Sequence, residues 1–425
     1  MPAKKSPRTS SGKPDIPGLP ARRAALQMLD AVLRRGETLD MAAPAALKQV
    51  PRDADRALAR ALAGEVLRWL TDLDALIDCA TKKRLPDDAK PRMALRIMLA
   101  GWLRLETPPH AVVATGLPLL AGGPRRLAHG VFSTLTKREV RLPEAPTLPE
   151  PVAARWGERS PAIARGLAAP PPLDLTLRDP ETTQHWAVQL GGTSLAPGHL
   201  RLPRSGAVGA LEGYAEGAWW VQDLAASLPV RLLAAKPGEC VLDLCAAPGG
   251  KTLQLAAAGA EVTALDVSEA RLARLRENLA RTGLAAEVIV ADALGWEPAA
   301  PFDAILLDAP CSATGTCRRH PDVLHRIHPR QIAEMAELQT ALLTRASGWL
   351  KPGGRLVYAV CSLEQEEGEA VAVTCALTPE PITAAELPAG LNPSSEGWLR
   401  TDPGMLGEED GLDGFFIARW RNAAH

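Results

Sequence analysis

The sequence lacks any spacing of cysteines that would pair them or bind a metal ion. Its 425 residues include seven cysteines, and none of them forms a Cys-x-x-Cys or combines with a His-x-x-x-His pattern. Structural zinc sites and disulfide frameworks depend on such spacings. We therefore expect reduced thiols in a cytoplasmic protein, with no metal site and no disulfide scaffold.

Long apolar segments are missing as well. The apolar stretches are interrupted by Arg, Lys or Pro before they reach the length that spans a bilayer. Residues 1–20 contain Lys4, Lys5, Arg8 and Lys13 among Ser, Pro and Gly, and they lack the apolar core of a signal peptide. We expect this segment to be a disordered basic tail and the protein to have no membrane partner.

Charge of one sign does not dominate overall, because 48 Lys and Arg nearly balance 49 Asp and Glu. The charges are unevenly distributed, since residues 1–145 carry 25 basic and 15 acidic residues, whereas residues 236–425 carry 16 and 26. A basic first segment suits a polyanion such as RNA, although a solvated surface that binds nothing has the same composition. The acidic last segment would need a local basic patch to contact nucleic acid.

What the sequence does contain is a succession of three patterns. Residues 21–145 show apolar residues at helical spacing between Gly and Pro breakers, which predicts an all-α domain. Residues 146–235 begin with a proline-rich linker around a short predicted helix, Ala153–Leu167. They continue as a small α+β module, in which the tandem Trp219-Trp220 favours packing over stacking on bases. Residues 236–425 alternate strands and helices, which predicts a doubly wound, Rossmann-like α/β sheet.

A glycine-rich turn and several carboxylates stand at the ends of the predicted strands. The strand Cys240–Cys245 is followed by Ala246-Ala247-Pro248-Gly249-Gly250-Lys251, which has neither phosphate-loop nor dinucleotide-fingerprint spacing. Asp266, Asp292 and Asp308 follow further strands, at the edge where open α/β sheets bind ligands. One such Asp is more often a turn residue, but the series predicts a nucleoside pocket. Asp266 would accept ribose hydroxyls, and Asp292 would accept an adenine amino group.

Two cysteines follow apolar runs and would reach the same edge. Asp308 and Cys311 share one loop, and Cys361 ends the predicted strand that begins at Arg355. Carbon 5 of a pyrimidine is a weak nucleophile, so its methylation needs a temporary thiolate bond at carbon 6. A second group must then help to end that bond, and a carboxylate can steady the polarised base. The two cysteines and Asp308 supply this set.

These segments resemble the RNA cytosine-5 methyltransferases of the Nop/Sun family. The motifs that carry the resemblance are DLCAAPGGKT, DAPCSATGT, VYAVCS and DGFFIARW, and the helical region resembles NusB-type RNA-binding domains. The resemblance implies that Cys361 is the nucleophile, that Cys311 aids product release and that Asp308 touches base and methyl donor. It also implies that S-adenosylmethionine is held by Cys245, Ala246, Ala247, Pro248, Gly249, Gly250, Lys251, Asp266, Asp292 and Asp308.

The chain departs from the family pattern beside the expected nucleophile. The family often has Thr-Cys-Ser followed by a Glu-Glu-Asn run, whereas this chain has Val360-Cys361-Ser362 and then Glu366-Glu367-Gly368. The missing threonine removes a hydroxyl next to Cys361, which leaves the covalent step intact but puts fine tuning by that neighbour in doubt.

A basic segment follows the first thiol loop and begins with Arg318, Arg319 and His320. It would give the acidic domain a contact with RNA phosphates. The sequence thus predicts a monomeric, S-adenosylmethionine-dependent enzyme that methylates carbon 5 of a cytosine in small-subunit rRNA. Transfer RNA is the nearest alternative substrate, and an RNA-binding or assembly factor without turnover is an alternative of another class. The missing phosphate-loop spacing excludes a nucleoside triphosphatase.

Overall fold

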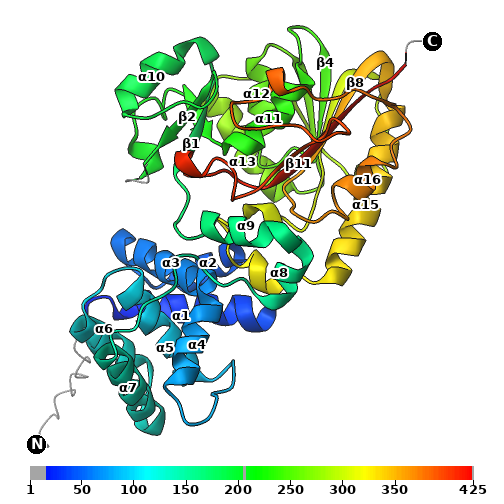
Figure 1. Cartoon of the computed structure of the whole chain (residues 1–425). Helices are drawn as coiled ribbons and strands as arrows, with labels where there is room; N and C mark the ends of the chain where they lie inside the picture. Colours follow the sequence, from blue (N-terminus) through cyan, green and yellow to red (C-terminus); the bar gives the residue numbers. More distant parts are fainter. Residues whose placement is uncertain (1–15, 204–206, 424–425) are drawn as a thin grey trace, which may run out of the picture. The chain divides into compact units, whose positions relative to one another are not determined.

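The computed structural model describes residues 16–203 and 207–423, and the chain divides into two compact units between Thr147 and Leu148. The first unit is helical, as predicted, and its α-helices are α1 (Leu19–Arg35), α2 (Leu39–Leu47), α3 (Asp53–Arg68), α4 (Leu70–Cys79), α5 (Lys90–Leu103), α6 (Pro109–Gly116) and α7 (Gly122–Lys137) (Figure 1). Helix α1 begins two residues before the expected start at Ala21. Most of the expected tail, residues 1–15, lies outside the described residues.

Helix α5 forms the centre of this first unit. Leu95 and Leu99 of α5 are fully buried, together with Leu62 of α3. Two buried arginines of α5 are paired with α4, because Arg96 contacts Asp74 at 2.7 Å and Arg92 contacts the same carboxylate at 3.0 Å. The apolar spacing seen in the sequence therefore marks a real core, and the buried charges within it are compensated.

The second unit begins with α8 (Glu150–Trp156) and α9 (Ser160–Gly166). The short helix predicted within the linker is thus present as two helices, and Nε1 of Trp156 donates a hydrogen bond to Glu364 at 3.1 Å. A three-stranded antiparallel sheet follows, in which β1 (Leu173–Leu177) lies between β2 (His199–Leu202) and β3 (Trp219–Val221), with α10 (Thr183–Leu190) between β1 and β2 in the chain. Trp219 and Trp220 are both buried, which agrees with the predicted packing role.

The rest of the unit is a mixed α/β sheet of the predicted class. Its strands are β4 (Cys240–Leu244), β5 (Glu261–Asp266), β6 (Glu287–Val290), β7 (Phe302–Asp308), β8 (Leu350–Val360), β9 (Thr378–Pro379), β10 (Leu399–Thr401) and β11 (Phe415–Arg421). The strand order is β10-β11-β8-β7-β4-β5-β6, and β9 pairs with β11. The strands from β6 to β8 are parallel, whereas β11 is antiparallel to β8.

Helices cover both faces of this sheet (Figure 1). They are α11 (Leu224–Leu233), α12 (Gly250–Ala257), α13 (Glu269–Thr282), α15 (Pro329–Gly348) and α16 (Glu369–Ala372). A short helix, α14 (Val323–Arg326), comes before α15 in the chain. Val241 of β4 packs in the cluster with α11 and α12, while its neighbour Leu242 packs in the cluster with α15 and α16. This alternation is that of a strand buried on both faces. Helix α11 and the strands β9 to β11 were not predicted from the sequence.

No helix in the described part of the chain combines the length and the apolar character needed to cross a membrane. The carboxyl ends of β4, β5, β7 and β8 reach one edge of the sheet, because these strands are parallel neighbours. All the predicted catalytic residues and donor-binding residues belong to strands or loops at this edge.

Candidate functional site

The glycine-rich turn after β4 is shaped by hydrogen bonds of its own backbone. The N–H groups of Cys245 and Ala246 both donate to the carbonyl of Leu265, at 2.8 and 3.0 Å. Gly249 has a φ of +108°, and a Cβ at this position would lie 2.3 Å from Cδ1 of Leu275. The turn therefore requires glycine here. Helix α12 begins at the next residue, so the N–H groups of its first turn are directed toward the loop.

Asp243 stands at the end of β4 and has no exposed surface. Its Oδ2 accepts a hydrogen bond from Thr252 at 2.5 Å, whereas its Oδ1 has no hydrogen-bond partner among the described residues. Burial raises the pKa of Asp243 to about 7, in spite of the hydrogen bond from Thr252. A buried carboxyl group with one unused oxygen, directly before the turn, fits a site that receives a polar or cationic ligand.

Asp266 and Asp292 follow β5 and β6, and backbone donors orient both. Asp266 accepts from the N–H of Ala247 at 3.1 Å and from the N–H of Ser268 at 2.8 Å. Asp292 accepts from the N–H of Leu294 at 2.9 Å. A carboxylate oxygen has a second lone pair, so these bonds fix the two side chains and leave acceptor capacity for a ligand.

Exposed apolar side chains flank these two carboxylates, a feature that reasoning from the sequence missed. Val267, Val290 and Leu294 are 70%, 45% and 40% exposed, although each is a large apolar residue. Apolar walls with a few placed polar groups are typical of pockets for flat organic ligands. The signal was present in the chain, because Val267 directly follows Asp266 and Leu294 stands two residues after Asp292.

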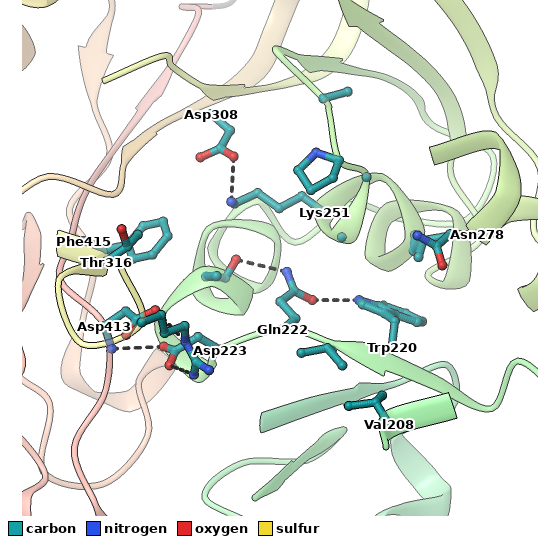
Figure 2. Close-up of a pocket in the computed structure, with 18 of the residues that line it drawn as sticks. Val208, Trp220, Gln222, Asp223, Lys251, Asn278, Asp308, Thr316, Asp413 and Phe415 are labelled. Atoms are coloured by element: carbon teal, nitrogen blue, oxygen red, sulfur yellow. Dashed lines mark hydrogen bonds and ion pairs between the residues drawn. The ribbon is translucent and has the colours of Figure 1, made fainter. Parts of the chain in front are cut away.

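Asp308 is joined to the glycine-rich turn by an ion pair. Nζ of Lys251 donates to Oδ2 of Asp308 at 2.8 Å and lies 5.2 Å from the centre of the Phe415 ring (Figure 2). Burial alone would lower the pKa of Lys251, but the attraction of Asp308 outweighs it and raises the pKa, with a further contribution from Cys361. Lys251 is therefore a protonated amine held close to both thiol loops.

The two predicted catalytic cysteines meet at the ends of β7 and β8. Their Sγ atoms are 3.4 Å apart. The hydrogen bond with Cys361, together with burial, raises the pKa of Cys311 well above that of a free thiol, so Cys311 keeps its proton. Burial also raises the pKa of Cys245, and Cys317 is fully buried. Among the described residues, no group of three or more His, Cys, Asp or Glu could hold a metal ion.

A cavity of about 570 Å³ lies beside Lys251 and Asp308. The predicted residues that line it are Ala246, Pro248, Gly249, Gly250, Lys251, Asp308, Arg319 and His320. Residues outside the predicted site also contribute, among them Trp220, Gln222, Asn278, Thr316, Asp413 and Phe415 (Figure 2). The predicted residues that do not line it are Cys245, Ala247, Asp266, Asp292, Cys311, Cys361 and Arg318. The cavity therefore lies between the turn and the middle module, apart from the carboxylates of β5 and β6.

The three residues of the predicted RNA contact have different surroundings. Arg318 is buried and donates to the carbonyl of Asp410. Arg319 donates to Asp223 at 2.7 Å and to Asp413 at 3.0 Å. His320 is half-buried at the cavity. The two arginines thus tie their loop to acidic residues of the same unit, and the contact with RNA phosphates stays a prediction.

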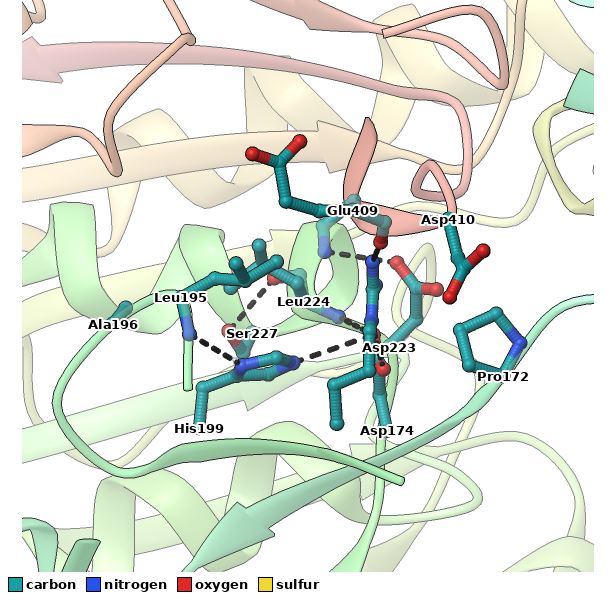
Figure 3. Close-up of polar contacts among 12 residues, drawn as sticks. Pro172, Asp174, Leu195, Ala196, His199, Asp223, Leu224, Ser227, Glu409 and Asp410 are labelled. Atoms are coloured by element: carbon teal, nitrogen blue, oxygen red, sulfur yellow. Dashed lines mark hydrogen bonds and ion pairs between the residues drawn. The ribbon is translucent and has the colours of Figure 1, made fainter. Parts of the chain in front are cut away.

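A buried polar network fixes the middle module next to the cavity (Figure 3). Asp174 of β1 accepts from Nε and Nη2 of Arg201, at 2.7 and 2.6 Å, and from the N–H of Leu224 at 3.1 Å. Nε2 of His199 lies 3.3 Å from the same carboxylate. Burial alone would raise the pKa of Asp174, but the hydrogen bonds from Arg201 and His199 lower it, so the group is ionised. The network connects β1 and β2 to the start of α11, beside the cavity residue Asp223.

Two families match separate parts of this chain. Residues 230–421 match the family described as 16S rRNA methyltransferase RsmB/F, and residues 19–119 match the NusB family. The chain is 36% identical over 430 residues to the ribosomal RNA small subunit methyltransferase B of Klebsiella pneumoniae, with 94% of this chain and 97% of that protein covered. It is also 36% identical to the protein of the same name from Citrobacter koseri, with 94% and 98% covered.

Solved structures share the fold. PH0851 superimposes with a TM-score of 0.71 at 24% identity, covering 96% of this chain and 99% of that chain. NSun6 from Pyrococcus horikoshii, solved with SFG, gives a TM-score of 0.56 at 20% identity and covers 65% of this chain and 97% of that chain. At these identities the similarity establishes the fold.

We predict that Gly249→Ala destabilises the protein, because the new Cβ would overlap Leu275 and alanine rarely adopts this φ. The expected loss in the free energy of unfolding is about 1–3 kcal/mol, measured by urea denaturation. Gly250→Ala is the matched control, since the nearest atom to its Cβ would be 3.5 Å away, on Gln222. Equal stability of the two variants would contradict the assigned role of Gly249.

We predict that Asp174→Asn destabilises the protein by about 3–5 kcal/mol near neutral pH, because Arg201 would remain buried without its counter-charge. The exposed Glu216→Gln serves as the control and should change the stability by less than about 0.5 kcal/mol. The folded state depresses the pKa of Asp174, so its contribution is complete above about pH 4 and is lost as the pH falls further. The difference between the wild type and Asp174→Asn, measured by urea unfolding, should shrink over that range.

Proposed function

Since the chain belongs to the RsmB/F family of 16S rRNA methyltransferases, we propose that it methylates carbon 5 of a cytosine in 16S rRNA through a covalent bond to Cys361. The observation that carries the proposed chemistry is the pair of thiols 3.4 Å apart, on loops that follow neighbouring strands of the sheet. The full-length similarity to rRNA enzymes, with the matched NusB region, favours rRNA over tRNA as the substrate.

The enzyme depends on S-adenosylmethionine, which supplies the methyl group when bound. The edge formed by β4 to β6 fits this donor, because it combines the unused Oδ1 of Asp243 with the exposed apolar Val267 and Val290. We assign the backbone of residues 245–251 and the side chains of Asp266 and Asp292 to the donor. The backbone of the turn would contact the polar end of the donor at the start of α12, and the two carboxylates would contact its ribose and adenine.

Cys361 is the proposed nucleophile, because it follows β8 directly and its sulfur contacts a second thiol. Cys311 keeps its proton and is 3.4 Å away, and Lys251 is a protonated amine close enough to interact with Cys361. Attack of the thiolate at carbon 6 forms a C–S bond and moves the electron pair of the ring double bond toward carbon 5, which becomes nucleophilic.

Cys311 is proposed to aid product release. After carbon 5 has received the methyl group, its proton must leave, and the electron pair of that C–H bond re-forms the ring double bond as the C–S bond to Cys361 breaks. Proton transfers of this kind need a group within hydrogen-bond reach. Cys311 is the group that the structure places beside the Cys361 sulfur, so its thiol would donate a proton to that sulfur as the C–S bond breaks, and the resulting Cys311 thiolate would take the proton from carbon 5.

Asp308 is proposed to hold the target base. Oδ2 of its carboxylate is bonded to Lys251, and its side chain is 29% exposed, so part of the group remains accessible from the cavity. A carboxylate in this position can accept a hydrogen bond from an N–H group of cytosine. It can thereby stabilise the protonated or polarised base as electrons flow into the ring. The ion pair with Lys251 would orient Asp308 during this contact.

The contact with RNA is proposed to extend beyond the target base. The net positive charge of residues 1–145 supports RNA binding by the NusB region, and Arg319 and His320 line the cavity near the catalytic loops. The base must be unstacked to reach the thiols, which favours rRNA before or without complete assembly as the substrate. We propose that the enzyme acts on it as a monomer in the cytoplasm.

We predict that Cys361→Ala abolishes methylation, because the thiol proposed to form the bond at carbon 6 is then missing. Bisulfite sequencing of 16S rRNA from cells that carry the wild type, the variant or neither would reveal a single protected cytosine in the wild type alone. The affinity for S-adenosylmethionine, measured by calorimetry, should stay within about twofold. Protection of the same cytosine by Cys361→Ala would refute the assignment of the nucleophile.

We predict that Cys311→Ala traps the covalent intermediate, because bond formation at Cys361 proceeds while release slows. A protein–RNA adduct that survives denaturing electrophoresis should accumulate with 16S rRNA and S-adenosylmethionine. Cys317→Ala is the control, since that thiol is buried outside the cavity. Wild-type turnover without adduct in Cys311→Ala would remove the proposed release role.

A further inference from the structure

Glu367 is a fully buried carboxylate that bonds to both thiol loops. Its Oε1 accepts a hydrogen bond from the N–H of Ser312 at 2.7 Å, and its Oε2 accepts from the hydroxyl groups of Ser312 and Ser362. Ser312 directly follows Cys311, and Ser362 directly follows Cys361. One side chain is thus bonded to the residue next to each of the two thiols.

Glu367 is itself held on two sides. Nε2 of Gln339, on α15, donates to Oε1 of Glu367 at 3.2 Å and to the carbonyl of Pro310 at 2.9 Å. The hydroxyl group of Tyr358, on β8, donates to the backbone carbonyl of Glu367 at 2.6 Å. The carboxylate therefore cannot shift without disturbing the loop before Cys311 or the strand before Cys361.

The burial of this group is energetically unfavourable by itself. Burial raises the pKa of Glu367, while the hydrogen bonds from Ser312, Ser362 and Gln339 act in the opposite direction. The free-energy cost of removing a carboxylate from water is offset only when its lone pairs accept hydrogen bonds, as they do here. A buried apolar side chain would fill the same space without this cost, so packing alone does not explain a glutamate at position 367.

We propose that Glu367 is a positioning residue, whose carboxylate joins the Cys311 loop to the Cys361 loop and so sets the distance between the two thiols. The inference rests on the proposed roles of Cys311 and Cys361. Ser312 and Ser362 are the residues through which Glu367 acts, and their hydroxyl groups are also 3.3 Å from each other. Glu367 itself touches neither thiol in this arrangement and takes no part in bond making.

The test compares Glu367→Ala with Glu367→Gln and with Glu366→Ala, an exposed neighbour that serves as the control. Glu367→Ala should lower the single-turnover methylation rate by about 100-fold, because a misplacement of about 1 Å has an effect of this size. The affinities for RNA and S-adenosylmethionine should stay within about twofold. Glu367→Gln should retain the rate within about tenfold, because an amide can still accept from Ser312 and donate to the two hydroxyl groups.

A second readout reports the thiol distance without methyl transfer. Diamide accepts two hydrogen atoms from a pair of thiols as the S–S bond forms, and mass spectrometry follows this reaction between Cys311 and Cys361. Glu367→Ala should slow it at least about tenfold, whereas Glu366→Ala should not change it. This measurement separates the inference from the proposed function, since it stays informative even if Cys361→Ala were active.

A double-mutant cycle then identifies the path of the effect. If Glu367 acts through the serines, Glu367→Ala should lower the methylation rate little further in a Ser312→Ala, Ser362→Ala background. An unchanged methylation rate or an unchanged diamide rate in folded Glu367→Ala would overturn the proposal, as would full additivity in the cycle. Should Glu367→Ala not fold, the double serine variant carries the same test, and wild-type rates in it would refute the positioning role.

Discussion

The catalytic centre depends on one constraint, the parallel pairing of β7 with β4 on one side and with β8 on the other. Leu244 of β4 stands opposite Leu307 of β7, and Asp308 stands opposite Ala359 of β8. Because adjacent strands are about 4.8 Å apart, the turn after β4, the loop after β7 and the end of β8 converge within a few residues. The ion pair between Lys251 and Asp308 and the contact between the two thiols both follow from this register.

Several charges at this edge are balanced within the protein. Lys251 is paired with Asp308, and Arg319 is paired with Asp223 and Asp413. Glu367 is satisfied by hydrogen bonds alone. In a water-poor site such pairs are strong, so they fix positions and protonation states before a ligand arrives. A substrate base therefore enters a preorganised arrangement, which is the condition under which electrostatic stabilisation is most effective.

The local pattern of the chain predicted the fold well, but the pairing of distant charges was beyond it. Strands such as Phe302–Asp308 and helices such as Thr183–Leu190 were predicted with the bounds that the structure shows, since their signals are local. The run at Arg318 and Arg319 predicts a contact with RNA phosphates, but a run of like charges gives no sign of acidic partners elsewhere in the chain. Asp223 is 96 residues before Arg319, and Asp413 is 94 residues after it.

The residues of the candidate site also fall into those with a local signal in the sequence and those whose role depends on distant contacts. The two cysteines and Asp308 could be found because their chemistry requires these residue types at strand ends. Glu367 was noted only as part of a departure from the family pattern, because its role depends on contacts with Ser312, 55 residues earlier in the chain. The cavity residues Trp220 and Asn278 were missed for a related reason, since they come from different elements that meet only in the folded chain.

The structure also clarifies the valine that stands where the family often has threonine. Val360 is fully buried and packs in the apolar cluster with Leu307 and Tyr358, so its side chain belongs to the core rather than to the thiol pair. A threonine at this position would bring its hydroxyl into that apolar cluster, where it would need a partner. Hydroxyl groups near the thiols are supplied instead by Ser312 and Ser362, both bonded to Glu367. The absence of threonine therefore removes no polar contact on which the two catalytic loops depend.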